Sequence, residues 1–486
     1  MAVYDYDIHP HYSSKVLQRG SEDYERCRRQ NANSDTPSRY PREIHVVRSV
    51  SDVSMALKRA AALKVPVGVR SGGHLFPCGA LVHDGVLVDT TDLNRAIEYD
   101  KVTQEICFGP AVRVKELAEK LSSIARFFPH GHAPTVAEGG FLLAGGQGWF
   151  MRGWGATCQQ WITRMEIVMP NGQAVIASRT ENQDVFWAAR GSGTGFFGVV
   201  TKFWGRTIPA SQMWERVMIF EVRDKFEGLL TWAFDRAKAT PKFGTDLNIA
   251  TFYDEKFTPS ATDEVSRDAK LLLGVFLMAY SDTQREAQTI LGAYTDIPTE
   301  LRACLLEERP VEKRTWDKVW EMQDEYCGSG NGQCWQINSI LNDPSVPIER
   351  LIEAIKPAVC QLPTRSSSSF ICIADIEADE EDAAFSLPQQ KYISTFTGWK
   401  DPTLQPSIYR PMRERYKRLS SVACGMYVAD YDITCDDANM KVMSDTALAR
   451  FLRIRAKWDP NELFPNYKKF VETHDKINRL QSQCQL

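Results

Sequence analysis

The sequence predicts an α+β protein made of two joined lobes. Its 486 residues exceed what one hydrophobic core usually serves. In residues 43–100, short β-branched runs alternate with a single helix pattern, whereas residues 210–432 place longer amphipathic helices between strands. The second pattern is typical of an antiparallel sheet backed by helices.

The composition predicts a well-packed globular protein without a nucleic-acid or membrane partner. Hydrophobic residues make up 43% of the chain, and 58 basic residues against 62 acidic ones leave a net charge of −4. This balance argues against a nucleic-acid partner or a membrane-surface patch. No run approaches the ~20 apolar residues of a membrane-spanning helix. The oligomeric state stays open.

A cytoplasmic location is expected, because the N-terminal residues show no basic stretch followed by an apolar one. The last three residues, Cys-Gln-Leu, only distantly resemble a peroxisomal address. The twelve cysteines lack zinc-site spacing and are interpreted as mostly reduced thiols.

The elements of the first half follow from residue type and period. Residues 51–64 predict a helix opened by a Ser or Asp cap, and residues 114–123 and 182–190 predict two more helices. Residues 161–178 predict a hairpin that turns at Pro-Asn-Gly. The remaining expected strands are residues 43–50, 65–71, 85–93 and 199–208.

The second half repeats longer elements. Expected helices are residues 224–239, 282–295 and 348–359, and expected strands are residues 246–253, 270–280 and 367–376. Near the C-terminus, residues 445–458 predict a basic amphipathic helix stopped by Asp459 and Pro460, followed by a short strand-like piece.

Three glycine-rich segments carry the functional signal. The stretch Arg70-Ser71-Gly72-Gly73-His74 follows a strand, so its backbone N–H groups can form an anion-binding nest; a tight turn with a solvated arginine fits these five residues equally well. Alone, His74 could be a metal ligand, a base, a core residue or an anchor. Further glycine clusters at 131–155 and 191–198 indicate an extended cofactor threaded across the first lobe.

The third segment contains the spacing Gly-x-Gly-x-x-Gly at 193–198, which suggests a dinucleotide-binding fingerprint. That fingerprint requires a strand before it and a helix after it. Here a helix pattern precedes and the strand-like residues 199–204 follow, so the sequence argues against a Rossmann fold.

The segments 65–74, 85–94, 131–161, 184–203, 427–432 and 457–464 occur in the order and spacing of the berberine bridge enzyme-like flavoproteins, which the chain resembles over nearly its whole length. This resemblance implies a PCMH-type FAD-binding domain in residues 1–207, a substrate-binding domain in 208–432 and a C-terminal segment, 433–486, that returns to the FAD domain. It also implies FAD linked covalently to His74. The implied FAD contacts are Arg70, Ser71, Gly72, Gly73, Thr135, Val136, Gly139, Gly140, Gly145, Gly146, Gly148, Thr157, Cys158, Gly198, Val199 and Val200.

Three positions bear on how FAD is attached and reoxidised, and at Ala133 the chain departs from the family pattern. Many members carry a second flavin link through a cysteine where this chain has Ala133, so a single link through His74 is expected. Cys158 is better interpreted as a buried structural thiol than as a reactive one. The small side chain of Val136 implies room for dioxygen beside the flavin.

Tyr427 takes the tyrosine position of a family Tyr-x-Asn stretch, which resemblance puts on a strand facing the flavin. It is the expected general base if a neighbour lowers its pKa, and core packing is the alternative. Asp430, Tyr431 and Asp432 are further candidates. Ala429 and Ala447 stand where the family usually has asparagines.

The resemblance implies a covalent-FAD oxidase of secondary metabolism that removes two electrons from an alcohol, amine or phenolic small molecule and passes them to dioxygen. A flavin-containing cyclase or isomerase without net redox chemistry is the alternative, and a flavin carrier without turnover is a third. No metal is expected, although His130 and His132 have a spacing that could bind one.

Overall fold

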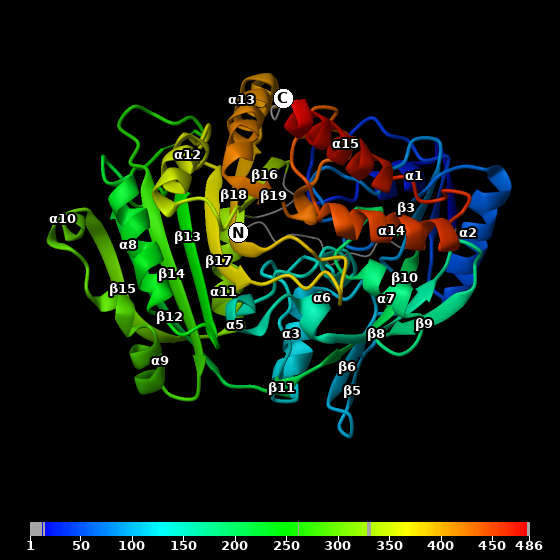
Figure 1. The fold of residues 1–486 in the computed structure, drawn as a ribbon, viewed down its shortest axis with the longest axis horizontal. Helices are drawn as coiled ribbons and strands as arrows, with labels where there is room; N and C mark the ends of the chain where they lie inside the picture. The colour runs from blue at the N-terminus through cyan, green and yellow to red at the C-terminus, as the bar shows by residue number, and fades with distance from the viewer. Residues whose placement is uncertain (1–11, 13–14, 261, 328–331, 484–486) are drawn as a thin grey trace.

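The first lobe begins with a small mixed sheet at the right of Figure 1. The computed structural model describes residue 12 and residues 15–260, 262–327 and 332–483. The strand order is β1-β2-β4-β3, in which β2 and β3 both run parallel to β4 and β1 is antiparallel to β2. Its elements are β1 (Val16–Gln18), α1 (Glu22–Arg28), β2 (Glu43–Val46), α2 (Val50–Leu63), β3 (Val67–Arg70) and β4 (Val86–Asp89).

A second, antiparallel sheet completes this lobe in the order β5-β6-β10-β8-β9. The predicted hairpin is confirmed, because β8 pairs antiparallel with β9. The strands are β5 (Ile97–Asp100), β6 (Glu105–Phe108), β8 (Ile162–Val168), β9 (Ala174–Ser178) and β10 (Val199–Arg206). The helices are α3 (Val114–Ser123), α4 (Glu138–Leu143), α5 (Met151–Trp154), α6 (Thr157–Gln160) and α7 (Gln183–Ala189), and β7 (Arg126–Phe127) pairs with β11 (Ile208–Pro209).

The second lobe is one antiparallel sheet of eight strands, ordered β15-β12-β14-β13-β17-β18-β16-β19. The outer face of the sheet is packed with helices, and the inner face turns toward the first lobe (Figure 1). The strands are β12 (Gln212–Glu221), β13 (Thr245–Phe252), β14 (Leu272–Ser281), β15 (Leu305–Arg314), β16 (Cys334–Asn342), β17 (Ser368–Ile376), β18 (Gln389–Trp399) and β19 (Ala423–Gly425). The helices are α8 (Phe226–Lys238), α9 (Gln284–Ile290), α10 (Thr299–Arg302), α11 (Trp316–Cys327), α12 (Ile348–Cys360) and α13 (Gln405–Lys417).

Alternation along the strands decides which lobe each side chain meets. On β16, Ile340 joins the cluster under the helices, whereas Leu341 joins the core of the first lobe. Tyr392 and Ile393 divide in the same way on β18. The inner face of the sheet is therefore one wall of whatever lies between the lobes.

The C-terminal helices α14 (Asp445–Trp458) and α15 (Tyr467–Gln483) pack on the first lobe, where Phe451 and Phe470 enter its core. The division into 1–207, 208–432 and 433–486 stays a prediction. Two local predictions were wrong. The strand-like piece expected after Pro460 includes helix α15, and residues 428–430 form the 3-10 helix η6 (Val428–Asp430) rather than a strand. The last three residues, Cys-Gln-Leu, lie outside the described residues.

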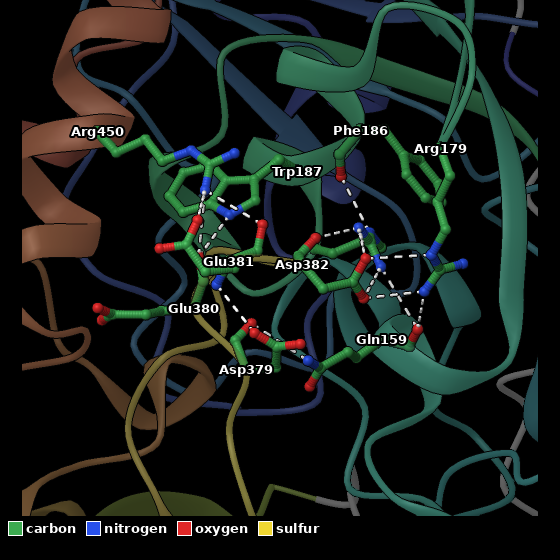
Figure 2. A network of polar contacts seen from close by, with 10 residues as sticks. Gln159, Arg179, Phe186, Trp187, Asp379, Glu380, Glu381, Asp382 and Arg450 are labelled. Atoms are coloured by element: carbon green, nitrogen blue, oxygen red, sulfur yellow. Dashed lines mark hydrogen bonds and ion pairs between the residues drawn. The ribbon is translucent and has the colours of Figure 1, made fainter.

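A polar network fastens the connection between β17 and β18 to the first lobe (Figure 2). Arg190 is buried and donates from Nη1 to Oδ2 of Asp382 at 2.8 Å, and Arg179 donates to the same oxygen at 2.9 Å. Trp187 Nε1 donates to the carbonyl of Glu380 at 2.8 Å, and Arg450 of α14 lies over the Trp187 ring. The second lobe is thus tied to both the first lobe and the C-terminal helices.

Replacing Asp382 with alanine should lower the free energy of unfolding by about 2 kcal/mol, because the buried cation of Arg190 loses its carboxylate. Burial raises the pKa of Asp382, but hydrogen bonds from Arg190 and Arg179 outweigh it and lower the pKa overall. The wild-type advantage should therefore disappear as pH falls toward the lowered pKa. Urea unfolding followed by tryptophan fluorescence at several pH values measures the loss of unfolding free energy and its dependence on pH. Asp84→Ala breaks the exposed pair with Arg19 and should cost under about 1 kcal/mol; equal losses in the two variants would contradict the prediction.

Candidate functional site

The first glycine-rich loop follows β3 and carries His74. Nε2 of His74 lies 3.0 Å from Oγ1 of Thr135, which is 61 residues away in the second glycine-rich segment. Burial, together with the cation of Arg113, lowers the pKa of His74 to about 4. The imidazole is therefore neutral near pH 7 and keeps a lone pair on one ring nitrogen. The structure brings together two residues that the sequence analysis assigned to one site.

The side chain of Arg70 differs from its expected role. Its guanidinium is buried and donates from Nε to Oδ2 of Asp89 at 2.9 Å, with a second bond from Nη2 to the same oxygen. Nη2 also lies 3.1 Å from Sγ of Cys27. A buried cation needs such a partner. The charge of Arg70 is thus compensated inside the first lobe and is not added to an anion nest.

Close backbone packing defines the loop. A Cβ on Gly72 would lie 2.7 Å from Cβ of Ala137, and one on Gly139 would lie 2.8 Å from Cβ of Pro110. A Cβ on Gly140, at the exposed start of α4, would meet nothing within 4 Å. Close packing therefore requires glycine at the first two positions, whereas the protein itself leaves room for a side chain at Gly140.

The glycines after α4 connect that helix to α6 through backbone hydrogen bonds. The carbonyls of Gly145 and Gly146 accept the N–H groups of Cys158 and Thr157, each at 2.9 Å. Thr157 Oγ1 donates to the carbonyl of Pro129 at 2.6 Å, and a Cβ on Gly148 would collide with that carbonyl. Cys158 is buried, and burial raises the pKa of its thiol to about 12, in agreement with a structural thiol.

The third glycine-rich segment forms the 3-10 helix η2 (Gly193–Gly195) and leads through Gly198 into β10. The expectation that a strand follows is confirmed, so the pyrophosphate-binding helix of a Rossmann fold is absent here. The side chains of Val199 and Val200 belong to the core of the first lobe. Their implied FAD contacts can therefore involve only the backbone near Gly198.

Buried polar atoms without partners show whether FAD fits. Within the described residues, Oγ of Ser192, Oγ1 of Thr194 and both carboxyl oxygens of Glu138 lack a hydrogen-bond partner. Burial raises the pKa of Glu138 to about 8, so it is a neutral donor near pH 7. These atoms lie on α4 and on η2, which contact each other. Together with the open space at Gly140, they fit a polar cofactor such as FAD.

Tyr427 is buried, and its ring lies 6.0 Å from that of Tyr392 on β18. Burial and the charge of Asp430 raise its pKa, whereas a lowered pKa was expected for a base. Tyr392 donates from its hydroxyl to Oδ2 of Asp430 at 2.8 Å. Burial raises the pKa of Asp430 to about 6 although hydrogen bonds from Ser339 and Tyr392 oppose it. The carboxylate is thus ionised at pH 7 but is a stronger base than an exposed aspartate.

A pocket with about 1000 Å³ of empty space, including its open mouth, reaches Asp430. It lies between residues 33–39, the edge strand segment of β16, α13 and residues 426–440. Phe76, two residues after His74, lines it and stacks on Trp335 with ring centroids 5.9 Å apart. The pocket therefore joins the end of the His74 loop to the Tyr392–Asp430 pair.

His130 and His132 do not form a metal site. Burial lowers the pKa of His130 to about 4, and its ring lies 4.6 Å from that of Trp316. The ring of His132 lies 4.3 Å from that of Trp149, which packs in the cluster between the lobes. In the part of the chain that the structure describes, no group of three His, Cys, Asp or Glu side chains could hold a metal ion. The ten cysteines with described side chains are free.

Comparison with known proteins agrees with this geometry. Residues 41–178 match the model of the FAD binding domain. The FAD-linked oxidoreductase ptmO of Penicillium ochrochloron is 34% identical over 473 residues, which cover 92% of this chain and 94% of that protein. The chain belongs to the FAD-linked oxidoreductases. A second member, nodO of Hypoxylon pulicicidum, is 36% identical over 189 residues, or 39% of this chain and 42% of that protein.

A solved structure supports the fold of this FAD-linked oxidoreductase. The wild-type BBE-like 1 protein of Physcomitrella patens is 18% identical and superposes with a TM-score of 0.75 over 93% of this chain and 96% of that one. The predicted α+β fold with a PCMH-type FAD-binding domain is confirmed. Among the described residues, no helix is long and apolar enough to cross a membrane.

Sequence reasoning missed Tyr392 and left Asp430 unranked. Tyr392 sits in an ordinary strand pattern, and its partner lies 38 residues away in a 3-10 helix. Nothing in either local pattern indicates the pair. Arg39, which also lines the pocket, precedes every motif that was recognised.

Substituting Gly140 with alanine should reduce bound FAD at least severalfold without loss of stability, because the new methyl group enters space that the protein leaves open. The ratio of flavin to protein absorbance after purification measures the FAD content, and thermal unfolding measures the stability. Gly292→Ala is the matched control, since its Cβ also meets nothing within 4 Å. Full FAD content in Gly140→Ala would show that the cofactor does not pass this residue.

Proposed function

We propose that this oxidoreductase is an oxidase with FAD attached by one covalent bond, through His74, and that it oxidises an alcohol, amine or phenolic small molecule. The contact between His74 and Thr135 carries the proposal, because it fixes a neutral imidazole at the junction of two glycine-rich segments. Bound FAD would accept two electrons from the substrate as a hydride and pass them to dioxygen, giving hydrogen peroxide.

The residues that would hold FAD come from all three segments. Backbone groups of Ser71, Gly72 and Gly73 would face the pyrophosphate, and the backbone around Gly198 the adenine end. The unpaired hydroxyls of Ser192 and Thr194 are available as further donors. Ala133 has no atom that could form a thioether, which supports one link rather than two.

The Tyr392–Asp430 pair is the best-supported proton acceptor. Asp430 lines the pocket, so a substrate hydroxyl or amine there can reach its carboxylate. Tyr392 holds that carboxylate in place through its 2.8 Å hydrogen bond. Tyr427, whose pKa is raised by burial, is the weaker candidate for the base.

Dioxygen as acceptor rests on Val136, whose small, partly buried side chain packs beside the cluster between the lobes. Together with the xylooligosaccharide oxidase of Thermothelomyces thermophilus, which is 36% identical over 164 residues, it favours oxidase chemistry. The cyclase alternative keeps one observation in its favour. Ala429 and Ala447 remove two amide side chains, and Ala447 is buried in the apolar core of the first lobe.

Denaturing precipitation should leave the flavin on the wild-type protein, and peptide mass mapping should find it on the peptide that contains His74. His74→Ala should release the flavin into the supernatant, because no other described residue is expected to bond it. Flavin on a cysteine peptide would contradict the single-link proposal.

The value of kcat/KM should fall as pH drops below about 6, because Asp430 becomes protonated there. Asp430→Asn should lower the rate about 100-fold to 10 000-fold and abolish this acid limb. Tyr427→Phe should keep the limb. The measurement uses a substrate found by a peroxide-coupled screen of alcohols, amines and phenols. If Tyr427→Phe loses the limb and Asp430→Asn keeps it, Tyr427 is the base.

Anaerobic mixing with that substrate separates oxidase from cyclase. An oxidase must bleach its flavin absorbance in a single turnover, and Asp430→Asn should slow the bleaching. Product formation with unbleached flavin would instead support the cyclase.

A further inference from the structure

We propose that the pocket above β16 recognises a carboxylate on an aromatic or otherwise planar substrate, and that Arg39 binds this carboxylate. The inference rests on the proposed function only in taking this pocket as the substrate pocket. The evidence for it depends neither on the covalent bond between His74 and FAD nor on dioxygen as the electron acceptor.

Arg39 is a cation that forms no ion pair with a carboxylate in the described part of the chain. Its Nη2 donates to the carbonyl of Pro77, and its Nε is buried without a hydrogen-bond partner. The charge of Asp432 acts on Arg39 without such a pair and favours its cationic form. Burial lowers its pKa, which reflects the cost of withdrawing the cation from water. A ligand carboxylate would supply the missing charge, and the guanidinium fork suits its two oxygens.

The neighbouring strand offers more unpaired polar atoms to the same pocket. Trp335 and Gln336 are at least nine-tenths buried, and each has a polar side-chain atom without a partner within the described residues. The nitrogen atoms among the unpaired groups are donors. The unpaired atoms on residues that line the pocket are Nε of Arg39, Nε1 of Trp335, Oε1 of Gln336 and Nδ2 of Asn338. Donors predominate, so the pocket suits an oxygen-rich acceptor group.

The other cations of the pocket are already compensated. Arg413 lies 3.8 Å from Oδ2 of Asp432 and 3.5 Å from Oδ1 of Asp437, and Lys417 pairs with Asp437. Asp35 accepts a hydrogen bond from Gln405 at the exposed rim. Arg39 is therefore the lining cation that remains available to a substrate.

The aromatic walls supply the second half of the recognition. Phe76 and Trp335 stack with an interplanar angle of 17°, and Phe396 meets Phe76 edge-on at 6.0 Å. Tyr409 lines the pocket on the side of α13. A flat ring system can extend this stack while its carboxylate reaches Arg39.

The pocket is also pre-organised around Arg39. Asn33, on the same segment, donates from Nδ2 to the carbonyls of Phe76 and Trp335 and accepts the N–H of Trp335 at 3.0 Å. These bonds fix the segment against both the His74 loop and the edge of β16. Binding would therefore not have to order the chain that carries the cation.

The test is calorimetric titration of the oxidised holoenzyme near pH 7 with benzoate, 2-naphthoate and indole-3-acetate, each compared with its primary amide. At least one carboxylate should bind about tenfold or more tightly than its amide, since hydrogen bonds to charged groups outweigh neutral ones. Arg39→Gln should abolish this preference while changing amide binding less than about twofold. Added salt should weaken carboxylate binding in the wild type alone.

Arg39→Lys keeps the charge without the fork and should retain part of the preference, which covers the case that the glutamine variant does not fold. Arg29→Gln is the matched control at an exposed helix end and should behave as wild type. Three outcomes would overturn the proposal: equal binding of amide and carboxylate, an unchanged preference in Arg39→Gln, or no binding by any of the three carboxylates. Because the titration needs no turnover, such a result leaves the proposed oxidase activity standing or falling on its own tests.

Discussion

The close contact between the loop after β3 and the start of α4 is the constraint on which the rest of the site depends. The two segments follow different sheets of the first lobe, and Gly72 lets them approach until no Cβ would fit against Ala137. That approach puts His74 within hydrogen-bonding distance of Thr135 and leaves the space beside Gly140 open. A side chain at Gly72 would separate the segments and remove both consequences together.

The sequence predicted those parts of the site that depend on the residue types of one short segment. Glycines, a histidine after a strand and a Pro-Asn-Gly turn each carry their conformational meaning wherever they occur. The expected strands 246–253, 270–280 and 367–376 match β13, β14 and β17 for the same reason, whereas β12, β15, β16, β18 and β19 were not predicted. The failure at residues 428–430 has a local cause too: the strand was implied by resemblance, whereas Val428-Ala429-Asp430 has no apolar alternation that would favour a strand over a 3-10 turn.

The parts that could not be predicted depend on partners far away in the chain. Arg70 belongs to a motif that suggests an anion nest, yet Asp89, on the neighbouring parallel strand, takes its charge. Tyr392 becomes chemically distinctive only beside Asp430, and Asp430 only through its burial. The helix α15 gains its stability from packing of Phe470 into the first lobe, which a basic, polar sequence does not reveal.

The side chain of Asn33 links the first lobe to the edge of β16 through hydrogen bonds, beside the pocket that the two lobes share. The edge of β16 is covered by β19 only at Leu341 and Asn342, so the outer backbone groups of Trp335 would otherwise be unpaired. Asn33 satisfies both of them with its side-chain amide, as a neighbouring strand would, and also binds the carbonyl of Phe76. Because Phe76 follows His74 by two residues, this amide sets the distance between the flavin attachment point proposed here and the wall of the pocket. Between Trp335 and Leu341, no strand of the described residues pairs with this edge of β16, so that segment stays free to face a ligand.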